Sequence, residues 1–142
     1  MLSKITANLV VPSVNDALGF YQRILGFNLV MGVPAGSQEI VTAHGDAPLA
    51  FAIVERDGVE LMLQSRQSLL QELPTLKRQP GGGFVSLYIR VTDARELYEN
   101  IRRKVTVLKD LHTTFYGTEE FYVLDCNGYV LTFAGSPKES KA

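Results

Sequence analysis

The chain has 142 residues, of which 46% are hydrophobic and 20% charged, with 14 Lys and Arg against 15 Asp and Glu. This length suits one domain, or two half-size units that share a core, and the hydrophobic fraction excludes a disordered chain. The near balance of charge disfavours a nucleic-acid binder, which would carry a basic excess. The single cysteine, Cys126, allows no intrachain disulfide and indicates a reducing compartment.

No segment approaches the roughly 20 apolar residues that span a bilayer, and the N-terminus lacks the apolar core of a signal peptide. We therefore expect a cytoplasmic, unprocessed protein that has neither a membrane nor a nucleic acid as its partner. The composition favours a compact soluble domain and leaves its ligand open.

The first half of the chain predicts a strand, a helix and three further strands. Ser13 is placed to cap the helix, with Asp16 at capping-box spacing, and Gly26 is placed to end it. Apolar residues recur between them at helical spacing. Asp57-Gly58 predicts a tight turn between the last two strands. The strands are expected at residues 5–11, 27–33, 49–55 and 59–64, with 39–43 as a candidate short strand.

The second half repeats this pattern after a connecting helix at residues 65–73 and a glycine-rich segment at 77–83. Thr92 or Asp93 is placed to cap its helix, and Asn127-Gly128 to turn its last hairpin. Its strands are expected at residues 84–91, 105–109, 120–124 and 129–134. The repetition predicts one domain, residues 1–142, made of a first module at about 4–64, a linker at 65–82 and a second module at about 83–134.

Alternation in the first and last strand of each half predicts one apolar sheet face and one mixed face, because residues two apart share a face. The apolar set is expected to lie under the helices: Ala7, Leu9, Val11, Val59, Leu61, Leu63, Val85, Leu87, Ile89, Val91, Tyr129, Leu131 and Phe133. The mixed set is too polar for a sealed core: Thr6, Asn8, Val10, Glu60, Met62, Gln64, Ser86, Tyr88, Arg90, Val130, Thr132 and Ala134. Such a face is either a ligand cleft or a solvated sheet surface.

Several segments resemble the vicinal oxygen chelate superfamily, which includes glyoxalase I, extradiol dioxygenases, fosfomycin-modifying enzymes and bleomycin resistance proteins. The more specific segments are FYQRILGF at residues 20–27 and DCNGY at 125–129, supported by 58–64 and 87–91. The resemblance covers nearly the whole chain. It implies an α+β fold in which two tandem βαβββ modules form an open, barrel-like mixed sheet around a cleft, commonly in a homodimer.

Metal-using members of this superfamily carry His, Gln or Glu ligands on four strands. The resemblance maps these positions to Thr6, to Glu60 or Met62, to Ser86 and to Thr132. The glyoxalase-like alignment selects Glu60 for the second position, and the internal repeat selects Met62. Hydroxyl groups are poor ligands for a divalent ion, and one carboxylate does not make a catalytic metal site. We therefore expect no metal and no other cofactor, as in the bleomycin resistance branch.

The mixed face supplies most candidate ligand-binding residues. Glu60 is predicted to hold a cationic ligand or act as a base, or else to form an ion pair with Arg90 or another cation of the cleft. Tyr88 offers an aromatic platform, which could equally pack against the linker. Arg90 could bind a carboxylate or phosphate, or be a plain surface charge.

The loop expected at residues 110–117 supplies the other candidates. His112 is predicted to form a rim together with Tyr116 and Glu120, and the alternative is a surface histidine without a role. His44 has no partner at a useful spacing and is assigned none. No catalytic residue is assigned. The predicted ligand-binding set is Asn8, Glu60, Met62, Gln64, Ser86, Tyr88, Arg90, His112, Tyr116 and Thr132.

Three hypotheses for the function follow from this pattern. The first is a metal-independent protein that binds an unknown small molecule, with a resistance or sequestering role. The second is a divergent lyase or dioxygenase that uses Glu60 as a metal ligand or base. The third is a dimerisation module with a vestigial cleft. Since the chain has no Trp and nearly balanced charge, bleomycin itself is not favoured as the ligand.

Overall fold

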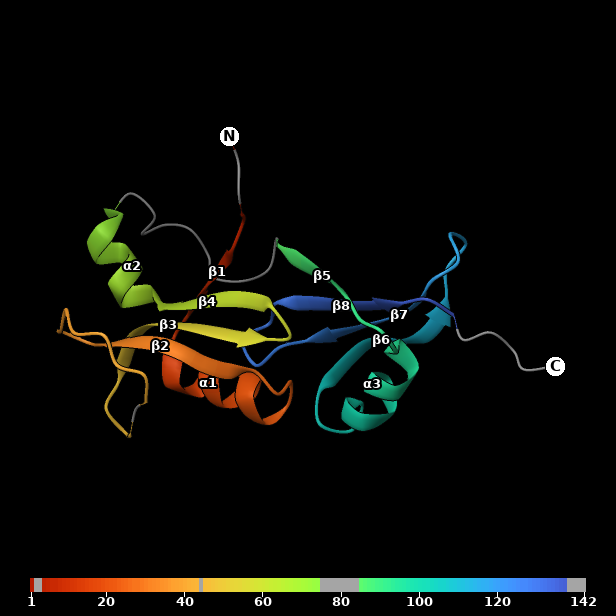
Figure 1. Ribbon diagram of the computed structural model, residues 1–142, viewed down its shortest axis with the longest axis horizontal. Helices are drawn as coiled ribbons and strands as arrows, with labels where there is room; N and C mark the ends of the chain where they lie inside the picture. Colours follow the sequence, from red (N-terminus) through yellow and green to blue (C-terminus); the bar gives the residue numbers. More distant parts are fainter. Residues whose placement is uncertain (2–3, 44, 75–84, 138–142) are drawn as a thin grey trace. The chain divides into compact units, whose positions relative to one another are not determined.

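The computed structural model describes residues 1, 4–43, 45–74 and 85–137. The chain divides into two compact units, Met1–Gly82 and Gly83–Ala142, and each contains one βαβββ module (Figure 1). The predicted α+β class with two such modules and open mixed sheets is confirmed. His44 and the glycine-rich part of the predicted linker lie outside the described residues. None of the helices within the described ranges is long and apolar enough to cross a membrane.

The first unit is a four-stranded sheet in the order β1-β4-β3-β2, in which β1 runs parallel to β4 and the other pairs are antiparallel. Its elements are β1 (Ala7–Val11), α1 (Val14–Arg23), β2 (Asn28–Pro34), β3 (Leu49–Arg56), β4 (Val59–Ser65) and α2 (Arg66–Glu72). Asp57 and Gly58, with φ of 53° and 81°, form the predicted tight turn between β3 and β4. The candidate strand at residues 39–43 is reduced to one bridge, between Gly32 and Val41.

The second unit has the matching order β5-β8-β7-β6, with β5 parallel to β8. Its elements are β5 (Ser86–Arg90), α3 (Ala94–Ile101), β6 (Thr106–Thr113), β7 (Glu119–Leu124) and β8 (Val130–Gly135). β6 continues past its predicted end, because His112 and Thr113 still pair with Glu120 and Glu119 across two register shifts. The prediction that His112 lies in a loop is therefore wrong, and this residue belongs to a strand.

Side-chain caps begin the main helix of each unit as predicted. The Ser13 hydroxyl accepts a hydrogen bond from the Asp16 N–H at 3.1 Å, and the Asp93 carboxylate accepts one from the Glu96 N–H at 3.0 Å. Each cap satisfies an N–H group that has no partner within its own helix. Gly26, with φ of 70°, follows α1 in the left-handed conformation that commonly ends a helix.

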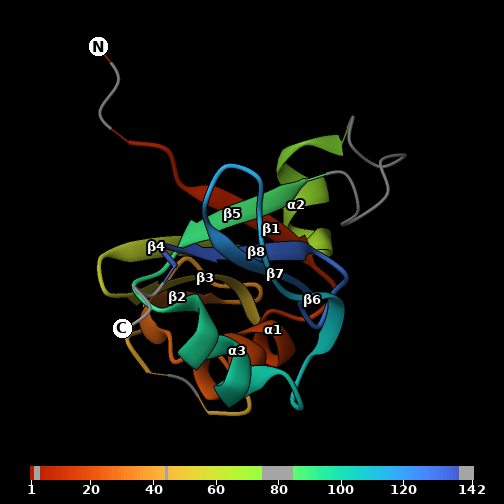
Figure 2. The same ribbon diagram turned by 90° about the vertical axis from the view of Figure 1, so that its right-hand side faces the viewer.

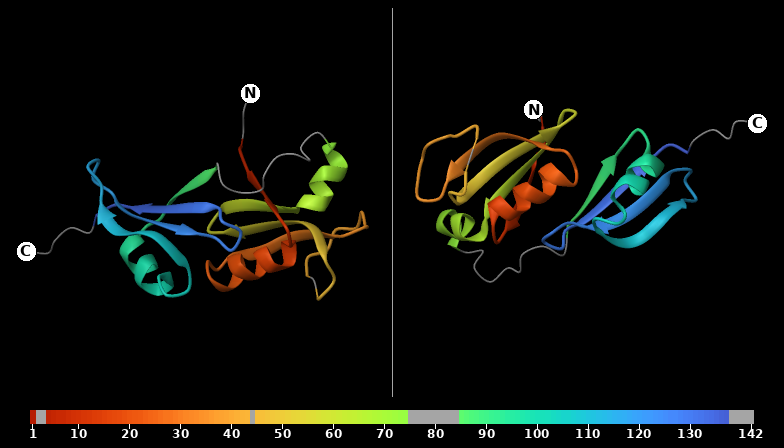
Figure 3. Two further views of the ribbon diagram at one scale, coloured as in Figure 1. Left: turned by 180° about the vertical axis from the view of Figure 1, so that it is seen from behind. Right: turned by 90° about the horizontal axis from the view of Figure 1, so that it is seen from below.

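Each sheet buries one face under its helix, with α1 across the first sheet and α3 across the second (Figure 3). Most of the predicted apolar set that lies within the strands is buried there: Leu9, Val11, Leu61, Leu63, Leu131 and Phe133. Val59 and Val85 are exposed instead, since one flanks the β3–β4 turn and the other precedes β5. In the second unit, the turn between β6 and β7 rises on the side of the sheet away from α3 (Figure 2).

Candidate functional site

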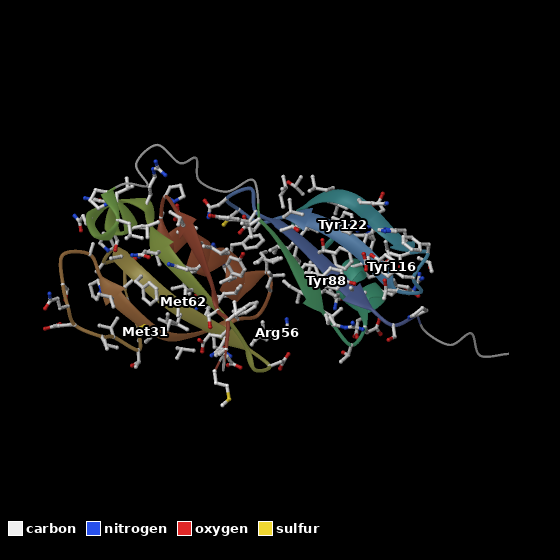
Figure 4. The ribbon with its side chains drawn as sticks, turned by 90° about the horizontal axis from the view of Figure 1, so that it is seen from above. Met31, Arg56, Met62, Tyr88, Tyr116 and Tyr122 are labelled. Atoms are coloured by element: carbon white, nitrogen blue, oxygen red, sulfur yellow. The ribbon has the colours of Figure 1, made fainter. Side chains whose placement is uncertain are left out.

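The face of the second sheet that lies away from α3 carries two rows of side chains across the four strands. Residues paired directly on neighbouring strands share a face. One row is Tyr88, Thr132, Tyr122 and Lys109, and the next is Arg90, Ala134, Glu120 and His112. Figure 4 shows Tyr88 and Tyr122 gathered on this face together with Tyr116 from the β6–β7 turn.

The Glu120 carboxylate lies at the centre of a group of hydroxyl donors. Its side chain is 0% exposed. Oε2 accepts hydrogen bonds from the hydroxyls of Tyr88 at 2.6 Å and Thr118 at 2.8 Å. The Tyr116 hydroxyl lies 2.8 Å from Oε1 and 2.9 Å from Oε2, and the Tyr122 hydroxyl lies 3.5 Å from Oε1. These five residues are named the Glu120 cluster below.

The cluster keeps its carboxylate ionised and the phenols of Tyr88 and Tyr116 protonated. Burial acts to raise the pKa of Glu120, but the three close hydroxyl donors and the nearby His112 outweigh it and lower that pKa below its usual range. The pKa values of Tyr88 and Tyr116 are raised, first by the hydrogen bond to Glu120 and then by burial. A carboxylate with a lowered pKa is a weak base and such phenols are weak acids, so the cluster suits recognition better than proton transfer at neutral pH.

A braced turn brings Tyr116 over the sheet. The Thr114 N–H donates to the Thr118 carbonyl at 2.8 Å, and the two threonine hydroxyls are 2.8 Å apart. Gly117 has φ of 87°, a conformation that L side chains rarely adopt. The neighbouring Phe115 is fully exposed, and its ring contacts the Tyr116 ring edge-on at a centroid distance of 5.0 Å. The turn thus holds one tyrosine on the carboxylate and presents another aromatic ring to solvent.

Four predicted site residues lie on the same face of the second sheet as the Glu120 cluster, and one of them is a member of it. Tyr88 is a member of the cluster, and His112 meets the Tyr122 ring edge-on at 5.6 Å. Thr132 is buried between Tyr88 and Tyr122 in the register. Arg90 is exposed at the end of β5. Among the other predictions for this unit, Tyr116 joins the cluster from the turn, and Ser86 begins β5 opposite Val130.

The predicted site residues of the first unit make contacts of their own. The Asn8 amide donates to Gln64 Oε1 at 2.9 Å, and the Gln64 amide donates to the Ser68 hydroxyl at 3.1 Å. Glu60 forms an ion pair with Lys4 at 3.0 Å rather than with Arg90.

Met62 completes the predicted site residues of the first unit. It is half-buried in a row with Asn8, Ile53 and Met31.

The pattern of the sequence underestimates Glu120, which it places only on a rim, and leaves out Thr118 and Tyr122. Extending the alternation to β7 would have indicated two of these residues. Glu120 and Tyr122 are two positions apart, and they pair with Ala134 and Thr132 of the mixed set. The β6–β7 turn folds back over the strand and brings Thr118 to the carboxylate. The alternation of side chains along a strand does not predict this.

The positions that the resemblance assigns to metal ligands do not fit a divalent ion. Glu60 is the one carboxylate among them, and it is held by Lys4. Thr6, Ser86 and Thr132 offer only neutral hydroxyl groups, which compete poorly with water for such an ion. Within the part of the chain that the structure describes, no group of three or more His, Cys, Asp or Glu residues could hold a metal.

Comparisons with known proteins agree with this fold. The chain is similar in structure to a protein of unknown function from Agrobacterium tumefaciens str. C58, with a TM-score of 0.72, 18% identity and 96% of each chain covered. It is similar to TioX from Micromonospora sp. ML1, with a TM-score of 0.66, 17% identity, and 95% of this chain and 99% of that chain covered.

A third similar structure is the bleomycin-binding protein from bleomycin-producing Streptomyces verticillus, complexed with copper(II)-bleomycin. Its TM-score is 0.58 at 21% identity, with 97% of this chain and all of that chain covered (100%). At these identities the likeness concerns the fold alone. No curated protein matches the sequence. Residues 4–133 match the family model of the Glyoxalase/Bleomycin resistance protein/Dioxygenase superfamily, and the chain belongs to that superfamily.

Proposed function

We propose that this protein is a cytoplasmic, metal-independent member of its superfamily that binds a small organic molecule and sequesters it, as a resistance protein would. The binding surface is the face of the second sheet that carries the Glu120 cluster. One observation carries the proposal: a buried, ionised carboxylate lies beneath aromatic rings that are half exposed. Tyr88 is 52% exposed and Tyr116 is 54% exposed.

This combination distinguishes a binding surface from a solvated sheet face. Removing a carboxylate from water is unfavourable, and a solvated face has no need of it. Tyrosine rings provide flat apolar area beside a polar hydroxyl, which suits the stacking and orientation of a planar ligand. The alternative role for the cluster is to brace the β6–β7 turn, and this role makes no use of the exposed rings.

The superfamily supports small-molecule binding as a role for this fold, since the similar Streptomyces verticillus protein is a bleomycin-binding protein complexed with copper(II)-bleomycin. Metal independence is supported by the donor chemistry at Thr6, Glu60, Ser86 and Thr132. The lowered pKa of Glu120 supports recognition over general-base catalysis. The lyase or dioxygenase hypothesis, which needs Glu60 as ligand or base, is disfavoured by its ion pair with Lys4.

A thermal-shift screen of organic compounds tests the proposal. A compound present at 100 times its Kd stabilises the native state by about 2.7 kcal/mol, which corresponds to several degrees in Tm. The shift should be lost in Tyr88→Ala and Tyr116→Ala and kept in Ile40→Ala, a matched loss of an exposed apolar side chain in the first unit. If the shift in Tm persists in both tyrosine variants, the binding surface is not the Glu120 cluster. If no compound stabilises the protein, the proposed function is wrong.

Metal independence has a separate test. Protein purified under mild conditions and dialysed should contain no stoichiometric Fe, Ni, Mn or Zn by elemental analysis. A bound metal that survives dialysis contradicts this part of the proposal.

We also propose a homodimer, since each unit has an open sheet with two edge strands and one main helix. Light scattering at micromolar concentration should give twice the chain mass of 15.7 kDa. A mass equal to that of one chain contradicts the dimer.

A further inference from the structure

We infer that the ligand of the Glu120 cluster is a planar organic cation, such as an aromatic amidine or a protonated heteroaromatic amine, whose positive group lies against the Glu120 carboxylate. The inference rests on the proposed function and adds the charge and shape of the molecule that the surface accepts.

The first reason is the charge of Glu120, which its partners do not neutralise. Its hydrogen-bond donors are hydroxyl groups, and in the described residues no Lys, Arg or His nitrogen forms an ion pair with it. Glu119, its neighbour in β7, is also buried but is paired with Arg95 at 3.0 Å. Glu60 of the first unit is paired with Lys4. A buried carboxylate that is hydrogen-bonded but lacks a cation attracts one from a ligand.

The second reason is that the two carboxylate oxygens of Glu120 accept different numbers of short hydrogen bonds. Oε2 has three donors between 2.6 and 2.9 Å. Oε1 has Tyr116, whose single hydroxyl hydrogen is shared with Oε2, and the distant Tyr122 hydroxyl at 3.5 Å. A carboxylate oxygen can accept two hydrogen bonds. Because Glu120 is fully buried, a ligand N–H reaches Oε1 by taking the place of the shared Tyr116 hydroxyl, and a charged donor forms the stronger bond there.

The third reason is the aromatic surface around the carboxylate. The negative face of a tyrosine ring attracts cations, and a planar cation gains stacking area as well. The chain already uses this attraction, because Lys109 Nζ lies 5.8 Å from the centroid of the Tyr122 ring. Arg90 and His112 share the same sheet face without an ion pair to Glu120. The half-exposed rings of Tyr88 and Tyr116 remain available to a ligand.

Three small probes of nearly equal shape separate charge from stacking: benzamidine, benzamide and benzoate, which at neutral pH are cationic, neutral and anionic. Titrations followed by amide NMR signals of β7 and the β6–β7 turn give a Kd for each. Benzamidine should bind about tenfold more tightly than benzamide, because a charge-assisted hydrogen bond replaces a neutral one. Benzoate should bind most weakly. Glu120→Gln should remove the advantage of benzamidine over benzamide.

Two further variants keep the test decisive. Glu39→Gln changes an exposed carboxylate in the first unit, outside the predicted binding residues, and should leave the order of the three probes unchanged. Tyr116→Phe keeps the ring and removes one donor from Glu120, so benzamidine should bind as tightly or more tightly. If Glu120→Gln does not fold, the order of the probes in the unaltered protein and in Tyr116→Phe decides.

Benzamide or benzoate binding at the cluster as tightly as benzamidine overturns the inference and leaves small-molecule binding intact. No response to any probe at millimolar concentration also overturns it, because this charge and these rings must give benzamidine a measurable affinity. The compound screen then decides independently whether the proposed function stands.

Discussion

The two modules share a strand order and a capped helix, but the sheet faces opposite α1 and α3 carry different side chains. Across the four strands of the first sheet, one row reads Asn8, Met62, Ile53 and Met31. The matching row of the second sheet reads Tyr88, Thr132, Tyr122 and Lys109. The first row is apolar except for Asn8 and contains Met31 and Met62, whereas the second contains Tyr88, Tyr122 and a lysine (Figure 4). The repeated scaffold therefore leaves each module free to carry its own chemistry on one face.

The contrast is sharpest between two glutamates on these strands. The Glu60 side chain is 24% exposed and is neutralised by Lys4, whereas Glu120 is fully buried and held by neutral hydroxyls. One carboxylate belongs to a surface ion pair, and the other keeps its charge inside a polar cluster. Burial and the kind of partner, rather than residue type, decide which of the two is available for recognition.

Matched core truncations test whether the two modules depend equally on their cores. Leu63→Ala and Leu131→Ala each remove a fully buried side chain, opposite Leu9 in the first sheet and Leu87 in the second. Each should lower the free energy of unfolding by about 3 kcal/mol, from lost transfer energy and the cavity left behind. Urea denaturation measures both. A cost below about 1 kcal/mol in either variant would mean that its site relaxes to fill the space.

Isosteric replacement of the two glutamates tests their contrast directly. Glu120→Gln should destabilise the protein by about 2 kcal/mol, because several buried hydroxyls lose a charged acceptor. Glu60→Gln should cost less than about 1 kcal/mol, since exposed ion pairs contribute little. The same denaturation measurement serves both variants. Equal losses of stability would show that the Glu120 cluster contributes no more to the stability of the fold than the Glu60 ion pair does.

Removal of the helix caps tests how closely the modules match. Ser13→Ala and Asp93→Ala each delete a side chain that accepts an N–H in the first turn of a helix. Each should cost about 1 kcal/mol of unfolding free energy. A cap that can be deleted without cost would mark the helix that packing alone holds in place.

The pH dependence of stability tests the ionisation of the cluster. The pKa of Glu120 is lowered in the folded state, so its contribution is present above its ordinary pKa of 4.5 and is lost as pH falls through the lower folded-state value. The pKa values of Tyr88 and Tyr116 are raised, so their contribution is present below 10.0 and is lost as pH rises above it. Plotted against pH, the free energies of unfolding of the unaltered protein and of Glu120→Gln should converge in acid. Parallel curves would contradict an ionised cluster.

Local features of the fold are predictable from the sequence because their interactions span only a few residues. The Ser13 cap contacts Asp16 three positions later, and the Asp57-Gly58 turn depends on its own two residues. The alternation within a strand is equally local and identifies the mixed face of each module. The end of β6 is not predictable in this way, since pairing with β7 across register shifts extends it to His112 and beyond.

By itself the sequence determined the repeated βαβββ plan, the caps and turns, and the superfamily. It also predicted Tyr88 and Tyr116 as binding residues. Only the tertiary structure decided that both converge on Glu120, because Tyr88 is 32 positions away in the chain and reaches the carboxylate through the pairing of β5, β8 and β7. Burial of that carboxylate likewise depends on side chains from several strands and a turn. The charge that the site retains is thus a property of packing between distant segments.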